Sequence, residues 1–189
     1  SDVYKRQGIV CFLSFFVGGV DSIQTALNID SSFIPENLVG FATRQSIILE
    51  FAPTFMAIIL AGKVGSYITS SIGTMRVTEQ IDALELMGIN STAYLIGPKI
   101  VAAMVVIPML IILAAVLSIT GGYIVTATGS GITPADYERG LQIWFTEYDV
   151  ILMMVKALAF SFLITSVSSY QGYYVMGGSQ ELGLSLIHI

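Results

Sequence analysis

Three acidic side chains recur at regular spacing in one short polar stretch of this sequence. Glu79, Asp82 and Glu85 are three residues apart, so a helix would carry all three carboxylates along one face. Carboxylate oxygens bind hard divalent cations, which makes such a group a candidate metal site. Successive positions on a single helix seldom converge on one ion, however, and we therefore predict no metal site here.

The same stretch also carries an apolar face. Ile81 and Leu84 lie on another side of the expected helix, with Met87 beside Leu84, and Gly88 is a residue type that commonly ends a helix. The stretch lies between two long apolar runs, each long enough to cross a bilayer. We therefore predict a short amphipathic helix at a membrane surface, where a soluble protein partner can bind it.

Few charges lie inside the apolar runs, and each of them is a candidate functional group. Glu50 comes one turn before Pro53, Lys63 lies in the same run, and Lys156 lies in the last run. A charge at membrane depth costs a few kcal/mol on insertion scales unless it is paired or hydrated. Glu50 and Lys63 are about 20 Å apart along one straight helix, so they cannot pair there. An ion pair for Glu50 or Lys63 with another element, and snorkelling for Lys156, are the structural alternatives.

Composition identifies the class of protein. Of 189 residues, 54% are hydrophobic and only 11% are charged, whereas soluble domains have about 25% charged residues. The formal net charge of −5 does not favour nucleic-acid binding, which requires clustered Lys and Arg. These values predict an all-α, polytopic integral membrane protein.

Four apolar segments are long enough to span a membrane, which takes about 20 residues. The second can begin as a helix near Pro35, because proline suits a first helical turn. Between the third and fourth segments, Thr133-Pro134-Ala135-Asp136 has the pattern of a capped helix start. The predicted spans cover about residues 8–27, 47–72, 98–126 and 149–170.

We expect one membrane domain over residues 8–183, since the sequence has no repeat at a fixed period and no low-complexity linker. Residues 1–7 and 184–189 resemble non-native flanking sequence, and we expect the natural protein to extend beyond both ends. Excluding them removes His188, the only histidine. Most acid–base and metal chemistry is lost with it.

Small residues form a ridge along the second span at intervals of four residues. Small side chains let helix backbones approach closely, which is how helices associate in lipid. The ridge serves packing either within the chain or across a dimer. It consists of Ala57, Ala61, Gly65, Thr69 and Gly73. The third span repeats the device with Ala114, Ser118 and Gly122.

Hydroxyl groups in the fourth span do not form a catalytic set. No base accompanies them, so a serine nucleophile is not expected, and we interpret them as hydrogen-bonding groups between helices. They belong to Ser161, Thr165, Ser168 and Ser169.

Several segments resemble one known family, and the resemblance extends over nearly all of residues 8–183. The segments are Ala61-Gly62-Lys63-Val64-Gly65-Ser66, Ile72-Gly73-Thr74-Met75-Arg76-Val77-Thr78-Glu79-Gln80-Ile81-Asp82-Ala83-Leu84, Met87-Gly88-Ile89-Asn90, Tyr94-Leu95, Pro98-Lys99, Gln171-Gly172-Tyr173-Tyr174 and Gly177-Gly178. In these residues the chain resembles the MlaE (YrbE) permeases. These are membrane subunits of ABC transporters that move lipids together with MCE-domain proteins.

The sequence departs from the family pattern at three positions. The family usually has Arg where Lys63 stands, Gly where Ala52 stands and an acidic residue near Ser71. Lysine keeps the charge but loses the planar, bidentate fork of arginine, so a role that needs planar recognition does not transfer to Lys63. The family also has an amphipathic region before the first span and a fifth span after residue 183.

The resemblance implies a multi-pass permease of the bacterial inner membrane that works as a homodimer with two cytosolic ATPase subunits. The chain itself would be no enzyme and would bind no cofactor, because it has no Walker A pattern, so ATP and Mg²⁺ would bind the partner ATPase. The lipid substrate would follow an apolar path, for which Glu50 and Lys63 are the candidate polar or gating residues. The coupling helix that contacts the ATPase would comprise Glu79, Gln80, Ile81, Asp82, Ala83, Leu84, Met87 and Gly88.

Two other classes of function remain open at this point. A secondary transporter would use an ion gradient through Glu50 or Asp21 and would need no ATPase. A membrane scaffold would transport nothing. Co-purification distinguishes these two classes from an ABC transporter permease, because only the ABC transporter hypothesis requires an ATPase and an MCE-domain protein.

Overall fold

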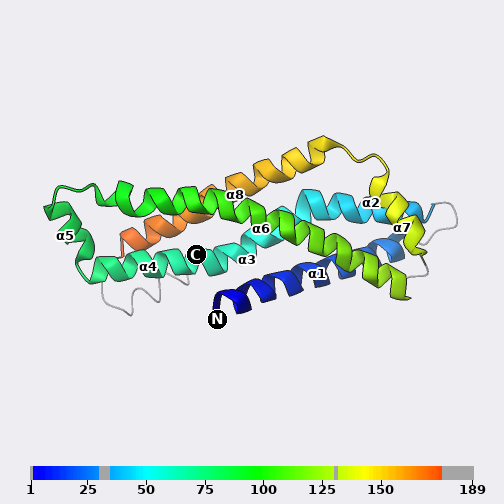
Figure 1. The fold of residues 1–189 in the computed structure, drawn as a ribbon, viewed down its shortest axis with the longest axis horizontal. Helices are drawn as coiled ribbons and strands as arrows, with labels where there is room; N and C mark the ends of the chain where they lie inside the picture. Colours follow the sequence, from blue (N-terminus) through cyan, green and yellow to red (C-terminus); the bar gives the residue numbers. More distant parts are fainter. Residues whose placement is uncertain (1, 30–34, 130–131, 176–189) are drawn as a thin grey trace. The chain divides into compact units, whose positions relative to one another are not determined.

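The fold is that of a computed structural model, which describes residues 2–29, 35–129 and 132–175. Within these ranges the chain forms helices and no strand, so the predicted all-α class is confirmed (Figure 1). The elements are α1 (Asp2–Ile29), α2 (Asn37–Ser46), η1 (Ile47–Phe55), α3 (Met56–Leu60), η2 (Ala61–Gly65), α4 (Ser66–Val77), α5 (Gln80–Leu86), α6 (Ser91–Gly129), α7 (Pro134–Gln142) and α8 (Glu147–Tyr173). Gly177-Gly178 and the flanking residues 184–189 lie outside the described ranges.

Among the described residues, four helical segments are long and apolar enough to cross a membrane, as predicted. Each extends past the predicted boundary at one end or both, because helical backbone continues into polar residues beyond the apolar run. The segments are Gly8–Ile29, Asn37–Val77, Ser91–Thr128 and Glu147–Tyr173.

The second span is one continuous helical run with two π-helical stretches. It starts just after Pro35, whose carbonyl oxygen accepts a hydrogen bond from the N–H of Leu38 at 3.0 Å, so the predicted start is confirmed. Glu50 and Pro53 lie in η1, and Lys63 lies in η2. Proline has no N–H and clashes with the preceding turn of an α-helix, and the wider π register accommodates it without breaking the helix.

The chain divides into two compact units. Residues 1–56 and 109–156 form the first unit, and residues 57–108 and 157–189 form the second. Each crossing between units falls inside a helical run rather than in a linker. The prediction of a single membrane domain stays a prediction.

In the first unit, α1 and α6 cross with their backbones in contact. A Cβ atom on Gly18 would overlap the backbone carbonyl of Ser118, and one on Gly121 would overlap the carbonyl oxygen of Phe15. The hydroxyl of Ser118 donates to the carbonyl oxygen of Ser14 at 2.7 Å. Small residues in the third span therefore permit close helix packing, as their spacing indicated.

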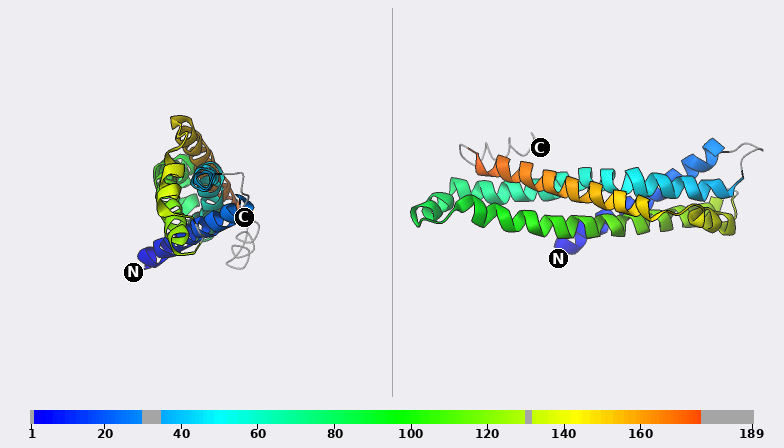
Figure 2. Two further views of the ribbon diagram at one scale, coloured as in Figure 1. Left: turned by 90° about the vertical axis from the view of Figure 1, so that its right-hand side faces the viewer. Right: turned by 90° about the horizontal axis from the view of Figure 1, so that it is seen from above.

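The same unit packs α7 beside α2, as Figures 1 and 2 show. The N–H of Asp136 donates to the hydroxyl oxygen of Thr133 at 3.2 Å, which confirms the predicted capped helix start. The ring of Tyr137 is fully buried, and its hydroxyl lies 3.4 Å from that of Ser22. Burial raises the pKa of Tyr137, so its hydroxyl stays protonated at neutral pH.

In the second unit, α4 packs against the last part of α8. The hydroxyl of Thr69 donates to the carbonyl oxygen of Ser168 at 2.9 Å, and a Cβ on Gly172 would lie 2.8 Å from the carbonyl oxygen of Thr69. Thr69 in the ridge thus packs within the chain. A role for the ridge of Ala57, Ala61, Gly65, Thr69 and Gly73 in a dimer stays a prediction.

The predicted role of the α8 hydroxyls needs correction. Ser161 donates to the carbonyl oxygen of Leu158, and Thr165 donates to that of Ser161, so both bond to their own helix. Ser and Thr hydroxyls reach the preceding turn of a helix easily, and this local bond needs no neighbouring helix. Among the described residues, the hydrogen bond that joins α8 to α4 is accepted by the backbone carbonyl oxygen of Ser168 and not made by a hydroxyl group of α8.

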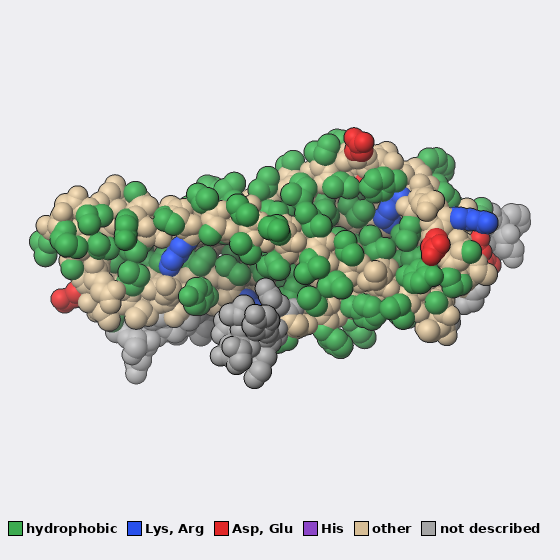
Figure 3. Space-filling model, viewed as in Figure 1, with side chains coloured by type: hydrophobic (Ala, Val, Ile, Leu, Met, Phe, Trp, Pro, Cys, Tyr) green, Lys and Arg blue, Asp and Glu red, His purple; other side chains and the backbone are tan. Residues whose placement is uncertain are grey.

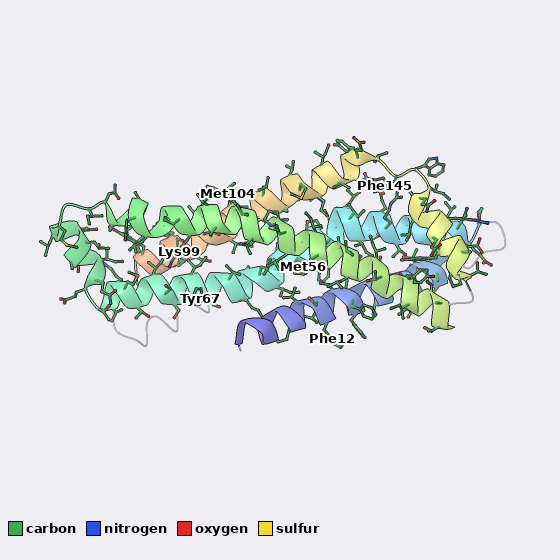
Figure 4. All side chains as sticks on the ribbon, viewed as in Figure 1. Phe12, Met56, Tyr67, Lys99, Met104 and Phe145 are labelled. Atoms are coloured by element: carbon green, nitrogen blue, oxygen red, sulfur yellow. The ribbon has the colours of Figure 1, made fainter. Side chains whose placement is uncertain are left out.

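Large apolar side chains remain exposed along the spans. Figure 3 shows hydrophobic side chains over most of the drawn face along α6, with few charges among them. Phe12 on α1 and Met104 on α6, both labelled in Figure 4, belong to this exposed set. In a membrane such side chains contact lipid tails, which are as apolar as the side chains themselves.

Candidate functional site

The turns that bound α5 fix its position in the second unit, between α4 and α6 (Figure 1). Glu79 has a left-handed backbone with φ of 58°, which reverses the chain directly after α4. At the other end, Gly88 has φ of 75°. Its N–H donates to the carbonyl oxygen of Glu85, and the N–H of Ile89 donates to that of Leu84 at 3.1 Å. This is a Schellman motif, so the predicted stop at Gly88 is confirmed.

The inward face of α5 packs on the core of the second unit. Ile81 is fully buried with Ile68, Ile72 and Leu95, and Leu84 packs against this cluster. Ile81 therefore cannot offer its side chain to a partner, contrary to its inclusion in the predicted contact set. Both side chains instead fasten α5 to the spans around it.

The outward face of α5 carries two prominent apolar side chains. Leu86 is 90% exposed and Met87 is 66% exposed. Other members of the predicted contact set are also exposed, namely Glu79, Gln80, Asp82, Ala83 and Gly88. Leu86 is absent from the contact set predicted from the sequence, although its place two residues after Leu84 puts it on the opposite side of a helix.

Polar contacts at this end tie α5 to its neighbours. Arg76 at the end of α4 donates to Asp82 at 2.7 Å, and its guanidinium lies 5.9 Å from the ring centre of Tyr173. Both partners of the ion pair are partly exposed, and such pairs are worth only about 0–1 kcal/mol. The pair therefore sets the orientation of α5 more than it stabilises the fold.

A second network joins α5 to the start of α6 and the end of α8. One carboxylate oxygen of Glu85 accepts hydrogen bonds from the hydroxyls of Ser91 at 2.8 Å and Tyr173 at 2.9 Å. These two bonds favour the charged form and lower the pKa of Glu85, so it is ionised at neutral pH. The predicted helix is thus connected to three spans through α4, α6 and α8.

In the first unit, the structure pairs two of the charges singled out in the spans. The ammonium group of Lys156 lies 3.1 Å from a carboxylate oxygen of Glu50 and donates to the carbonyl oxygen of Leu49 at 2.7 Å. Lys156 lies nine residues into α8, about 14 Å along the helix from Glu147, whereas the apolar part of a bilayer is about 30 Å thick. The pair therefore lies deep in the span, and Lys156 is paired rather than snorkelling.

Lys63 has a different setting, in the second unit. Its side chain is half-buried, and its ammonium group makes no hydrogen bond or ion pair with the described residues. Across the same residues, no group of three His, Cys, Asp or Glu side chains could hold a metal ion. The described residues therefore present a short, largely exposed helix at one end of the spans and a few charges within the spans.

Comparison with known proteins agrees with this geometry. The family model described as "Permease MlaE" matches residues 3–188. This chain belongs to the MlaE permease family. The resemblance inferred from the segments around Lys63 and α5 is thereby confirmed, and with it a multi-pass membrane protein.

Individual MlaE relatives differ in how specifically they are named. A "Probable ABC transporter permease protein" of Rickettsia bellii is 34% identical over 93% of this chain and 67% of its own length. A protein of the same description from Synechocystis sp. is 31% identical over 96% of this chain and 68% of its own. The "Intermembrane phospholipid transport system permease protein MlaE" of Haemophilus influenzae is 28% identical over 95% of this chain and 70% of its own.

The Glu50–Lys156 pair of this MlaE permease yields a stability prediction. Replacing Glu50 with Gln leaves the Lys156 charge unpaired at membrane depth, which should lower the free energy of unfolding by about 2–3 kcal/mol. The additional change Lys156→Met should restore stability by removing the orphaned charge. Thermal unfolding in detergent measures both variants, and a single variant as stable as the parent would contradict a structural role for the pair.

Proposed function

We propose that this chain is the permease subunit of an ABC transporter that moves phospholipids between the bacterial inner membrane and an MCE-domain partner. A separate ATPase supplies the energy. The observation that carries this proposal is the outward face of α5, where Leu86 and Met87 are exposed on a helix fastened to the spans behind it. An exposed apolar pair on a helix that is packed firmly against the spans is suited to insert into a groove of a soluble partner.

The attachment of α5 to the spans explains how such a partner would act on the membrane-spanning helices. A force on Leu86 and Met87 passes to the spans through Ile81, packed in the core, and through Glu85, bonded to α6 and α8. Packed cores transmit displacement because they are nearly incompressible. ATP-driven closure of two ATPase subunits would thus move both coupling helices of a permease homodimer.

The lipid path is proposed to use the two charges in the π-helical stretches. Glu50 keeps 69% of its side chain exposed despite its pairing, and Lys63 has no partner among the described residues. Exposed charge at membrane depth calls for water or a polar ligand, such as a lipid headgroup. π-helical turns are frequent at functional sites, which fits this assignment of Glu50 and Lys63.

One observation favours an ion-coupled secondary transporter as the second candidate. A carboxylate oxygen of Asp21 is buried in α1 without a hydrogen-bond partner among the described residues. Intramembrane carboxylates of this kind can bind protons in ion-coupled transport. Glu50 is less suited to that role, because Lys156 already neutralises it.

Co-purification tests the proposed function against this alternative. The permease, expressed with an ATPase and an MCE-domain protein of a related transport system, should retain both partners through detergent purification. A permease that retains neither partner, yet transports lipid, would contradict the ABC transporter assignment.

A further inference from the structure

The connection between α7 and α8 carries an aromatic surface that the proposed function does not use. Trp144, Phe145 and Tyr148 are 72%, 54% and 66% exposed, and we call these three side chains the aromatic platform. Figure 4 shows Phe145 at this connection. We propose that the aromatic platform binds the headgroup region of the lipid bilayer and holds the first turns of α8 at a fixed depth.

The platform continues a lipid-facing stripe of α8. Tyr148, Ile151 and Val155 are all exposed, and their spacing of three and four residues places them on one face of the helix. The helix is long and apolar enough to span a membrane, and Tyr148 is the second residue of that span. We therefore place Tyr148 where the span meets the membrane surface, and Ile151 and Val155 beside the acyl chains. Tyr and Trp are enriched at that level because each joins an apolar ring to a polar tip.

Arg44 of α2 holds the connection in place. Its guanidinium donates to the carbonyl oxygens of Leu141 at 2.6 Å, Ile143 at 3.0 Å and Trp144 at 3.3 Å. Carbonyls at a helix end have no partner within the helix, so this side chain satisfies the end of α7. Arg44 is itself almost fully buried, which fits a structural role rather than ligand binding.

These three hydrogen bonds from Arg44, which we call the Arg44 clamp, hold an unusual backbone conformation at Trp144. Its φ of 46° is in the left-handed region, which bulky residues rarely adopt. The indole packs edge-on against Phe41 at 5.6 Å, and Arg44 lies 5.2 Å from the ring centre of Phe41 and 5.4 Å from that of Phe145. Arg44 is therefore a positioning residue that keeps the indole outward beside the lipid-facing stripe.

Fluorescence tests this placement directly, because Trp144 is the only tryptophan in the chain. The chain is reconstituted in phosphatidylcholine vesicles that contain lipids brominated either near the headgroup end or near the methyl end of the acyl chain. We expect emission shifted to the blue of a water-exposed indole, stronger quenching by the headgroup-end bromines, and weak quenching by aqueous iodide. The Trp144→Phe variant supplies the background spectrum.

Two results would overturn the proposal. Emission typical of water, with strong iodide quenching and no effect of brominated lipid, would place the platform in the aqueous phase. Blue-shifted emission that neither quencher reaches would place it against protein. These measurements require no ATPase, so they succeed or fail independently of the proposed transport function.

The role of Arg44 is tested by Arg44→Lys, which keeps the charge but loses the fork that spans three carbonyls. We expect a red shift of the Trp144 emission and increased iodide quenching. Arg139→Lys is the matched control, since Arg139 is an exposed arginine of α7 outside the clamp, and it should leave the spectrum unchanged. An Arg44→Lys spectrum identical to that of the parent would contradict the positioning role.

Discussion

Replacing Leu86 or Met87 with aspartate is expected to abolish co-purification of the ATPase while the permease remains folded in the membrane. Both side chains are exposed on the outward face of α5, so the substitutions leave the core intact. Apolar anchors at the centre of an interface typically contribute about 2 kcal/mol or more each, roughly a thirtyfold change in affinity. Pull-down of the ATPase with the tagged permease measures the loss.

The control for this prediction adds the same charge at a nearby exposed position just after α5. Thr92 is exposed in the first turn of α6, where an acidic residue is compatible with the helix dipole, so Thr92→Asp should not affect co-purification. Leu84→Asp is a poorer test, because Leu84 packs on the core and its replacement mixes stability with binding. If Leu86→Asp and Met87→Asp retain as much ATPase as Thr92→Asp does, α5 is not the docking helix.

Substituting alanine at Gly18 or Gly121 is expected to cause a large loss of stability. At each position a Cβ would overlap a backbone carbonyl of the opposite helix, and a backbone cannot rotate away as a side chain can. Overpacking of a well-packed interior typically costs about 1–3 kcal/mol, and rigid backbone neighbours place these two sites at the upper end or beyond. Thermal unfolding in detergent should show a lower midpoint for both variants.

Gly62→Ala is the matched glycine control. A Cβ there would have no described atom within 4 Å, and alanine favours helix over glycine by up to about 1 kcal/mol. Its unfolding midpoint should therefore equal or exceed that of the parent. Equal effects at Gly18, Gly121 and Gly62 would show that the α1–α6 crossing does not need close backbone contact.

Local signals in the sequence were sufficient to predict most of the helices. Apolar runs of sufficient length gave the four spans, Thr133 and Asp136 gave the cap of α7, and Gly88 gave the end of α5. Each of these features depends on residues within a few turns of one another, where propensity and capping act directly. The small residues of the third span also predicted close packing correctly.

Contacts between distant residues were not predictable in the same way. Glu50 and Lys156 are 106 residues apart, and periodicity alone cannot show which two spans lie together. The hydrogen bonds from Arg44 to the carbonyl oxygens at and just after the end of α7 were not predicted for the same reason, since these partners are about 100 residues away in the sequence. An amphipathic pattern also cannot tell which apolar side chains of α5 face the core, so the predicted contact set included the buried Ile81 and left out the exposed Leu86.

The most direct test of the central claim is lipid transfer by the reconstituted complex. Permease, ATPase and MCE-domain protein are placed in vesicles that contain a fluorescent phospholipid, and transfer is followed with ATP, with a non-hydrolysable analogue, and after collapse of the ion gradients. The account predicts transfer that requires ATP hydrolysis, persists without an ion gradient and is lost in Leu86→Asp. Transfer that proceeds without the ATPase, follows an ion gradient and is lost in Asp21→Asn would contradict it.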